Sequence, residues 1–239
     1  MTQLLISDLH LCATRPQITK VFFEFLEGPA RAAQTLYILG DLFEYWAGDD
    51  DLDDPFNASV CDALSRLAMR GVKLYFIHGN RDFVIGGTFA GRAGVTLLDE
   101  ESVVDLTGTR TLLMHGDTLC TDDRAYMQFR ATVREPQWIA QTLAQPLSQR
   151  KAQIEELRRM SEQAKRDKAA SIMDVNQDAV DAVLRKHGYP RLIHGHTHRP
   201  AQHWHEVDAR RCERWVLADW YQSGSYLQCD AGGCRAVAF

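Results

Sequence analysis

Short, mainly apolar runs recur five times along the chain, and each leads into glycine or a polar residue. The runs lie at residues 4–7, 36–39, 74–77, 112–114 and 192–193. Such runs, bounded by turn residues, are typical of strands buried on both faces of a sheet. Apolar side chains at 3.6-residue spacing predict helices at residues 17–27 and 60–69. Strands that alternate with helices indicate parallel βαβ units and therefore an α/β fold.

The second half of the chain departs from this alternation. From residue 122 to about residue 170 the pattern predicts nearly continuous helix, between two of the predicted strand ends. We therefore expect a helical cap insertion, residues 123–172, over the site and within a single domain of residues 1–239. A further helix is expected at residues 174–186, and hairpins are expected around residues 107–109 and 230–233.

The residues that follow the five runs carry the candidate chemistry, because ligands bind at the carboxyl ends of strands in open α/β sheets. Together they offer seven oxygen or nitrogen ligands: Asp8, His10, Asp41, Asn80, His115, His196 and His198. A set without cysteine suits Mn²⁺, Fe²⁺ or Zn²⁺ better than Ca²⁺ or a structural zinc.

Seven ligands are too many for one ion that keeps positions open for water and substrate. They fit two ions about 3.5–4 Å apart, bridged by one carboxylate. Asp41 is expected to form the bridge, since it arrives from the central strand with no second ligand beside it. Two such ions clamp the oxygens of a phosphorus centre, so the set indicates hydrolysis of a phosphate ester or anhydride.

Two other stretches have plainer interpretations. Residues 49–54 are acidic, but a calcium loop needs Gly at its sixth position and Glu at its twelfth, where this chain has Asp54 and Val60. We expect a solvated loop there. Residues 86–94 are rich in glycine but lack Gly-x-Gly-x-x-Gly, so we expect turns rather than a dinucleotide-binding loop.

The remaining histidines and the cysteines are given structural roles. His78 and His194 precede glycines at strand ends and are expected in the core or behind the ligands, and His203 and His205 on an exposed hairpin. The six cysteines include no Cys-x-x-Cys pair, so we interpret them as reduced, in a cytosolic protein. They are Cys12, Cys61, Cys120, Cys212, Cys229 and Cys234.

The composition of the chain mainly excludes classes of partner and of location. The 239 residues are 45% hydrophobic and 25% charged, with a net charge of -5, which is ordinary for a globular enzyme. An acidic chain does not bind nucleic acid through its overall charge, so no nucleic-acid partner is expected, and no obligate protein partner is evident. No apolar run approaches the roughly 18 residues of a spanning helix, and no leader pattern precedes the first strand. We expect a cytoplasmic protein.

The strand-end motifs, in their order, closely resemble those of the calcineurin-like metallophosphoesterases. They are Asp8-Leu9-His10, Gly40-Asp41, Gly79-Asn80-Arg81-Asp82, His115 and Gly195-His196-Thr197-His198. The resemblance implies a β-sandwich flanked by helices. It also implies that one metal ion is held by Asp8, His10, Asp41 and His198. The other is implied to be held by Asp41, Asn80, His115 and His196.

Arg81 departs from the pattern of that family. Most members have histidine after the asparagine, where it is assigned as the acid that protonates the leaving group. The pKa of arginine is too high for that role, but a guanidinium can neutralise charge on a phosphoryl oxygen in the transition state. The residue therefore favours a leaving group that needs no proton, such as phosphate, and a phosphoanhydride as the substrate.

With arginine at this position, the chain resembles one branch of the family, the UDP-2,3-diacylglucosamine hydrolases of lipid A biosynthesis. The resemblance extends to the segments ISDLHL, YILGDLFEYWAGDD, HGNRDF, MHGDTLCTDD and HGHTHRP. The resemblance implies two Mn²⁺ ions and activated water that attacks the α-phosphorus of the substrate's pyrophosphate. The products would be UMP and 2,3-diacylglucosamine 1-phosphate (lipid X). Catalytic roles are implied for Arg81 and Asp41. Substrate contacts are implied for Asn80, Arg81, Asp123, Ser161, Lys165, Lys168 and His196, and for Arg158 by helix face and family together.

The predicted cap fits a lipid substrate. Residues 148–168 hold seven Lys or Arg against four Asp or Glu, and this basic stretch can bind phosphate and sugar. A slot for acyl chains is expected to be lined by Trp138, Ile139, Leu143, Leu147 and Leu157. For Trp138 and Leu143, packing of one helix on another is the alternative. We expect peripheral attachment to the cytoplasmic face of the inner membrane. The alternative is a soluble nucleotide phosphodiesterase or phosphatase of the same superfamily, which histidine at position 81 and a cap without apolar residues would favour.

Overall fold

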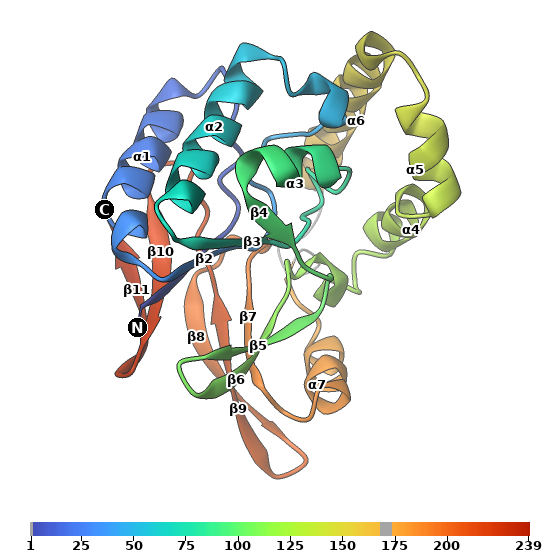
Figure 1. Ribbon diagram of the computed structural model, residues 1–239. Coiled ribbons are helices and arrows are strands. Elements are labelled where there is room, and N and C mark those ends of the chain that lie inside the picture. Colours follow the sequence, from blue (N-terminus) through green and yellow to red (C-terminus); the bar gives the residue numbers. More distant parts are fainter. Residues whose placement is uncertain (1, 168–173) are drawn as a thin grey trace.

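Two sheets form the centre of the computed structural model, which describes residues 2–167 and 174–239 (Figure 1). The strands are β1 (Gln3–Ile6), β2 (Thr35–Ile38), β3 (Lys73–Phe76), β4 (Val95–Leu97), β5 (Ser102–Leu106), β6 (Thr109–Leu113), β7 (Arg191–His194), β8 (Ala201–Val207), β9 (Arg210–Val216), β10 (Ser225–Asp230) and β11 (Gly233–Ala238). One sheet has the order β11-β10-β1-β2-β3-β4 and the other the order β5-β6-β7-β9-β8. Strands β1 to β4 run parallel, as do β6, β7 and β9. The predicted α/β fold is confirmed.

Helices cover the outer faces of both sheets. The helices are α1 (Pro16–Glu27), α2 (Pro55–Met69), α3 (Gly87–Ala93), α4 (Arg124–Val133), α5 (Pro136–Leu143), α6 (Leu147–Asp167) and α7 (Gln177–Lys186). Helices α1, α2 and α3 lie over the first sheet and α7 lies beside the second, whereas α4, α5 and α6 stand together at one side (Figure 1). Within the described residues, no helix has both the length and the apolar character needed to cross a membrane.

The buried side chains form layers that explain the continuous apolar runs. Leu4 and Ile6 of β1 pack beneath α1 and α2, whereas Leu5 between them points into the core shared by the two sheets. In the second sheet Leu113 points into that shared core and Leu112 packs toward α7. Side chains alternate across a strand, so a strand covered on both faces needs apolar residues at every position.

The acidic run at residues 49–54 is solvated only in part: Asp50 and Asp53 are exposed, but the prediction of a solvated loop is wrong for Asp49 and for the buried Asp51. The carboxylate of Asp49 accepts hydrogen bonds from the backbone N–H groups of Gly86, Thr88 and Phe89, at 3.0, 2.9 and 2.9 Å. These groups open α3, in the stretch where only turns were expected. A glycine at the helix start offers no capping side chain, so a carboxylate from a distant loop satisfies the free N–H groups instead.

The β8–β9 hairpin is less exposed than expected. The side chain of His205 is buried, and its ring lies 2.8 Å from the amide of Gln177 on α7 and 2.9 Å from Arg214 on β9. The expectation of an exposed position is therefore wrong for His205, because α7 covers this face of the second sheet. His194 is fully buried as expected and lies 3.0 Å from Arg214.

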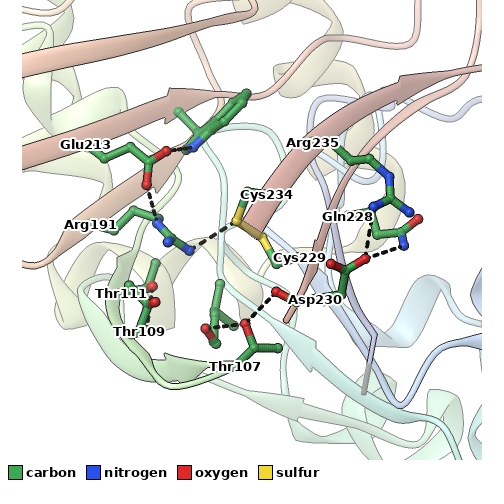
Figure 2. Close-up of a disulfide and its surroundings, with 12 residues drawn as sticks. Thr107, Thr109, Thr111, Arg191, Glu213, Gln228, Cys229, Asp230, Cys234 and Arg235 are labelled. Carbon is green, nitrogen blue, oxygen red and sulfur yellow. Dashed lines mark hydrogen bonds and ion pairs between the residues drawn. A yellow bond between two sulfur atoms is a disulfide. The ribbon is translucent and has the colours of Figure 1, made fainter. Parts of the chain in front are cut away.

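Two of the cysteines are joined. Cys229 and Cys234 are directly opposed residues of the β10–β11 hairpin and form a disulfide, with Cα atoms 4.2 Å apart (Figure 2). The prediction of reduced cysteines is wrong for this pair. The hairpin turn at residues 230–233 was predicted, but the spacing of the two cysteines does not reveal the strand register that brings them face to face.

The Asp49 contacts predict a large effect on stability. Replacing Asp49 by alanine removes the acceptor of three backbone N–H groups and of the Trp46 indole N–H. The free energy of unfolding is therefore expected to fall by about 2 kcal/mol in urea denaturation. Asp53 belongs to the same acidic run, but its side chain is fully exposed, and Asp53→Ala should change stability by less than about 0.5 kcal/mol. Equal stability of the two variants would contradict the capping role of Asp49.

Candidate metal centre

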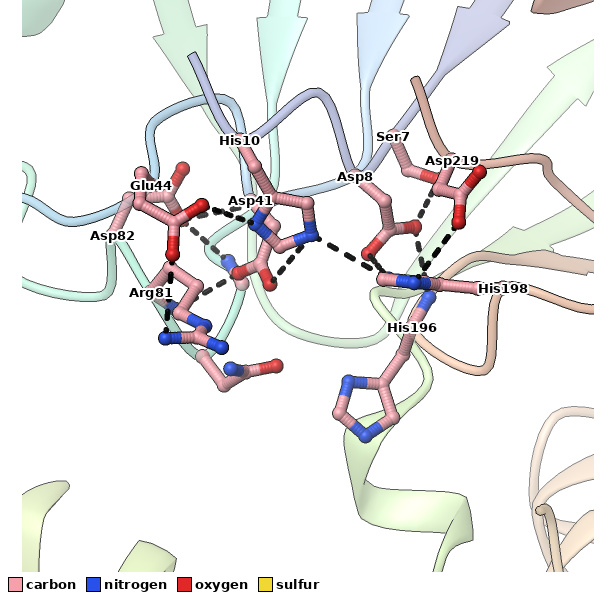
Figure 3. A network of polar contacts seen from close by, with 12 residues as sticks. Ser7, Asp8, His10, Asp41, Glu44, Arg81, Asp82, His196, His198 and Asp219 are labelled. Atoms are coloured by element: carbon pink, nitrogen blue, oxygen red, sulfur yellow. Dashed lines mark hydrogen bonds and ion pairs between the residues drawn. The ribbon is translucent and has the colours of Figure 1, made fainter. Parts of the chain in front are cut away.

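All seven predicted ligands meet at the carboxyl ends of strands from both sheets. Asp8 and His10 follow β1, Asp41 follows β2 and Asn80 follows β3. Strand β6 is followed by His115, and β7 by His196 and His198. Parallel strands within each sheet bring these ends to one edge, and the two sheets place their edges next to each other (Figure 3).

Two groups of ligand atoms are compact enough to hold a cation. Asp8, His10 and His198 offer one ligand atom each within 4.8 Å of one another, and so do Asp8, Asp41 and His115. In the first group the Nε2 atoms of His10 and His198 are 3.4 Å apart, and His198 Nε2 lies 3.3 Å from Asp8 Oδ1. Imidazole nitrogens and carboxylate oxygens that converge in this way suit a divalent transition metal.

The Asp41 carboxylate lies between the two sides of the centre. Its Oδ2 is 3.9 Å from His10 Nε2, and its Oδ1 is 3.8 Å from His115 Nε2. One oxygen thus faces each side, as a bridging carboxylate requires. On the second side, His115 Nε2 is also 3.0 Å from Asn80 Oδ1 and 3.2 Å from His196 Nδ1.

The backbone at this centre adopts a conformation that L residues rarely take. Five predicted ligands have a positive φ, between 50° and 67°. They are Asp8, His10, Asp41, His196 and His198. Each such residue costs on the order of 1–2 kcal/mol. Strain concentrated on the residues that converge on one point indicates that the loops are shaped for a ligand rather than for stability.

Two glycines allow the loops to approach one another. A Cβ atom at Gly79 would lie 2.1 Å from Asp41 Oδ1, and one at Gly195 would lie 2.2 Å from Asp8 Oδ2. Any side chain there would push the carboxylates out of the centre. The glycines of the Gly-Asn and Gly-His motifs are therefore required by the packing of the site.

Asp82 fastens two of these loops together. Its fully buried carboxylate accepts hydrogen bonds from the backbone N–H groups of Gly79, Asp41 and Leu42, at 2.9, 3.2 and 2.8 Å. The loop after β3 is thereby joined to the loop after β2. Asp82 orients the backbone of Asp41 and is more than the cap of a turn.

Burial sets the electrostatics of the centre. It raises the pKa of Asp41 to about 7, against the opposing charge of His115. It also lowers the pKa of His196 to about 3 and holds the pKa of His10 well below its usual value. Neutral imidazoles bind metal directly, and a divalent cation would compensate the cost of burying an ionised Asp41. The donor set and its charge balance fit a divalent metal.

His198 is oriented by a residue that the sequence analysis missed. Although burial alone would lower the pKa of His198, hydrogen bonds to Asp219 and Asp8 raise it to about 9. Asp219 Oδ2 lies 3.2 Å from His198 Nδ1, whereas Asp8 Oδ1 lies 3.3 Å from the other ring nitrogen, Nε2 (Figure 3 shows the three residues). This carboxylate fixes the tautomer that points Nε2 into the centre.

Comparison with known proteins agrees with this geometry. The family model described as calcineurin-like phosphoesterase matches residues 1–200. A relative from Aromatoleum aromaticum, named UDP-2,3-diacylglucosamine hydrolase, is 57% identical over 98% of this chain and 95% of its own length. Relatives with the same name from Cellvibrio japonicus and Pseudomonas aeruginosa PAO1 are 51% and 48% identical, and cover 98% and 100% of this chain and 97% and 99% of their own. The chain belongs to the calcineurin-like phosphoesterases, within the UDP-2,3-diacylglucosamine hydrolase family.

In this phosphoesterase the arginine of the Gly-Asn-Arg motif is joined to the centre through its backbone. The Arg81 N–H donates to Asp41 Oδ1 at 2.8 Å, and Arg81 Nη1 lies 3.7 Å from Glu44 Oε1. Glu44 was not predicted, although it lies three residues after Asp41 in a quoted segment. Tyr221 was also missed; its ring is parallel to that of His10, with centroids 5.3 Å apart. Asp219 and Tyr221 lie in a segment without a recognisable motif.

The predicted substrate contacts are only partly within the described structure. Asp123 accepts the N–H of Tyr126 and so begins α4. Arg158 on α6 donates to Glu44 at 2.9 Å, beside the centre. The side chains of Ser161 and Lys165, and the whole of Lys168, lie outside the described residues.

The position of Asp41 between the two sides predicts that metal binding depends on its charge. In Asp41→Asn an amide nitrogen replaces one oxygen of the carboxylate, and the negative charge is lost. The variant should therefore bind at least one divalent ion fewer per chain than the wild type, as measured by elemental analysis after dialysis. Asp53→Asn, in the exposed part of the acidic run, is the matched control and should retain the wild-type content. An Asp41→Asn variant that keeps all of its metal would remove Asp41 from the bridge.

Proposed function

We propose that this chain hydrolyses the pyrophosphate bond of UDP-2,3-diacylglucosamine and yields UMP and 2,3-diacylglucosamine 1-phosphate (lipid X), a step of lipid A biosynthesis. The proposal rests chiefly on near full-length similarity to hydrolases of that name. The convergence of all seven predicted ligands supports it further, because a relative that had lost the activity would be free to lose them. Water attacks the α-phosphorus, and the sugar 1-phosphate leaves.

The proposed cofactor is a pair of Mn²⁺ ions. Asp8, His10, Asp41 and His198 would hold one, and Asp41, Asn80, His115 and His196 the other. When bound, such ions polarise the phosphoryl oxygens and lower the pKa of a water molecule to make a nucleophile at neutral pH. A set of oxygen and imidazole donors without thiolate is consistent with Mn²⁺.

The residues around the ions would stabilise charge on the substrate and position it. Arg81 neutralises the charge that develops on the phosphoryl oxygens, and a phosphate leaving group needs no proton from it. The backbone N–H of Arg81 donates to Asp41 Oδ1, so the loop that carries the arginine is tied to the carboxylate proposed as the bridge. Asn80 and His196 would each help to hold a metal ion and would also contact the substrate.

We propose that residues 123–172 act as a cap that binds the rest of the substrate, with contacts from Asp123, Arg158, Ser161, Lys165 and Lys168. Leu143 and Leu157 expose 38% and 40% of their surface on α5 and α6, and side chains of this kind suit acyl chains. The ring of Trp138 instead lies 6.3 Å from the ring of Phe83, which supports a packing role. A lipid substrate suggests that the protein works at the cytoplasmic face of the inner membrane, bound peripherally.

The role of Arg81 predicts a clear separation of metal binding from catalysis. Arg81→His restores the residue that most phosphoesterases of this fold carry, so the variant should keep its metal. It should lose most of its diphosphatase activity, by about 100-fold in kcat, because the fixed positive charge is lost. Turnover of the lipid nucleotide at the wild-type rate would contradict this role.

Release of UMP from UDP-2,3-diacylglucosamine in detergent micelles, with and without added Mn²⁺, tests the proposed function. Manganese-dependent UMP is the expected result. If the chain instead hydrolyses a generic phosphodiester and releases no UMP from the lipid nucleotide, the proposed substrate is wrong. The chain would then be a soluble phosphodiesterase or phosphatase.

A further inference from the structure

A single buried carboxylate gathers several cations beside the metal centre. Glu44 follows β2 on the same loop as Asp41, and 8% of its surface is exposed. Its Oε2 lies 2.8 Å from Arg15 Nη2 and 3.8 Å from His10 Nδ1. Its Oε1 lies 2.9 Å from Arg158 Nη2 and 3.7 Å from Arg81 Nη1.

The two oxygens of Glu44 face different parts of the molecule. Oε2 faces the loop after β1, where Arg15 also donates to the backbone oxygen of His10. The backbone N–H of Glu44 donates to Leu11 O at 3.0 Å in the same loop. Glu44 is therefore fixed to the core on this side, and its Oε1 is held toward Arg81 and Arg158 (Figure 3 shows Arg81 and Glu44).

Oε1 joins arginines that come from separate elements. Arg81 lies in the loop after β3, next to Asn80, whereas Arg158 lies on α6. Two guanidinium groups repel each other unless an anion lies between them. Arg158 Nη2 donates a short charge-assisted hydrogen bond to Glu44 Oε1 at 2.9 Å. Arg81 Nη1 lies 3.7 Å from the same oxygen, so the charge of Glu44 orients Arg81 while the N–H groups of Arg81 stay available to another acceptor.

The cluster has more positive charge and more donors than Glu44 can use. Three arginines surround one carboxylate, so the cluster carries a net charge of about +2 when His10 is neutral. Among the described residues, Arg15 Nη1 and Arg158 Nε are buried and lack a hydrogen-bond partner. Buried guanidinium donors are costly to leave unsatisfied, and surplus donors beside a metal centre suit an oxyanion with two negative charges, such as a diphosphate.

We propose that Glu44 is a positioning residue for the reaction, which holds Arg81 and Arg158 together so that core and cap bind the diphosphate as one anion site. This inference rests on the proposed function, because it takes the diphosphate of UDP-2,3-diacylglucosamine as the ligand. Glu44 touches neither the substrate nor the reacting atoms. It acts through the two arginines, and Arg15 secures it from the other side.

The inference predicts that Glu44 and Arg81 are coupled in catalysis. Glu44→Gln keeps the shape of the side chain but removes the charge that orients both arginines, so kcat/KM for UMP release should fall by about 100-fold. In an Arg81→Gln background the same change should cost less than about tenfold, because Arg158 is then the only one of the two arginines that Glu44 still positions. A residue with a merely structural role would cost the same factor in both backgrounds, and that result would overturn the inference.

Three controls accompany this double-mutant cycle. Manganese content and the thermal unfolding midpoint of Glu44→Gln should match those of the wild type, which separates positioning from loss of metal or fold. Glu101→Gln is the matched control, because Glu101 is also paired with cations, but these are Lys186 and His187 at the C-terminal end of α7 rather than the arginines around Glu44. It should change kcat/KM by less than about twofold.

Crystal structures of the manganese-loaded wild type and Glu44→Gln provide a second reading that does not depend on activity. The guanidinium groups of Arg81 and Arg158 should move by more than about 1 Å in the variant, while Asp41 and His10 stay in place. Unmoved arginines would overturn the inference. A wild-type protein that releases no UMP would instead refute the proposed function, and the structures would still decide whether Glu44 positions the two arginines.

Discussion

The structure depends on burying two carboxylates, Asp8 and Asp41, within a few ångströms of each other at the meeting point of two sheets. Such a pair is unfavourable unless positive charge and hydrogen-bond donors surround it. The chain supplies imidazoles on both sides and the backbone N–H groups of Arg81 and His196. Almost every other feature of the site, including positive φ angles, close-approach glycines and the buried Asp82, keeps these two carboxylates in place.

The two-sheet architecture follows from the same requirement. The first sheet carries Asp8, His10, Asp41 and Asn80, and the second carries the remaining three histidines, so neither sheet holds a complete site. Their relative position is fixed by the apolar core between them, to which Leu5, Leu39, Ile77, Leu113 and Ile193 contribute. A substitution in this core would shift one sheet relative to the other and thereby displace the strand ends that carry the candidate ligands. Glu44 extends the arrangement to the helices of residues 124–167, because its carboxylate joins the loop after β2 to Arg158 on α6.

The sequence predicts those parts that local pattern determines. Continuous apolar runs predicted the central strands, and the residues at their ends are the candidate ligands that the structure brings together, because both follow from local sequence patterns. Contacts that depend on strand register or on loops far apart in the sequence were not predicted. Asp49 caps a helix about forty residues away, Cys229 meets Cys234 only in one strand register, and Asp219 supports His198 from a segment without a motif. Each of these depends on packing that no short stretch of sequence encodes.

The central claim is that one carboxylate bridges two ions. Titrating the metal-free chain with Mn²⁺ and recording electron paramagnetic resonance spectra tests it directly. The account predicts that two equivalents bind per chain. The six-line spectrum of the isolated ion should then give way to an exchange-coupled signal with the second equivalent, because two ions that share one carboxylate would lie about 3.5–4 Å apart. Saturation at one equivalent, or two equivalents that keep independent six-line spectra, would contradict the bridged centre.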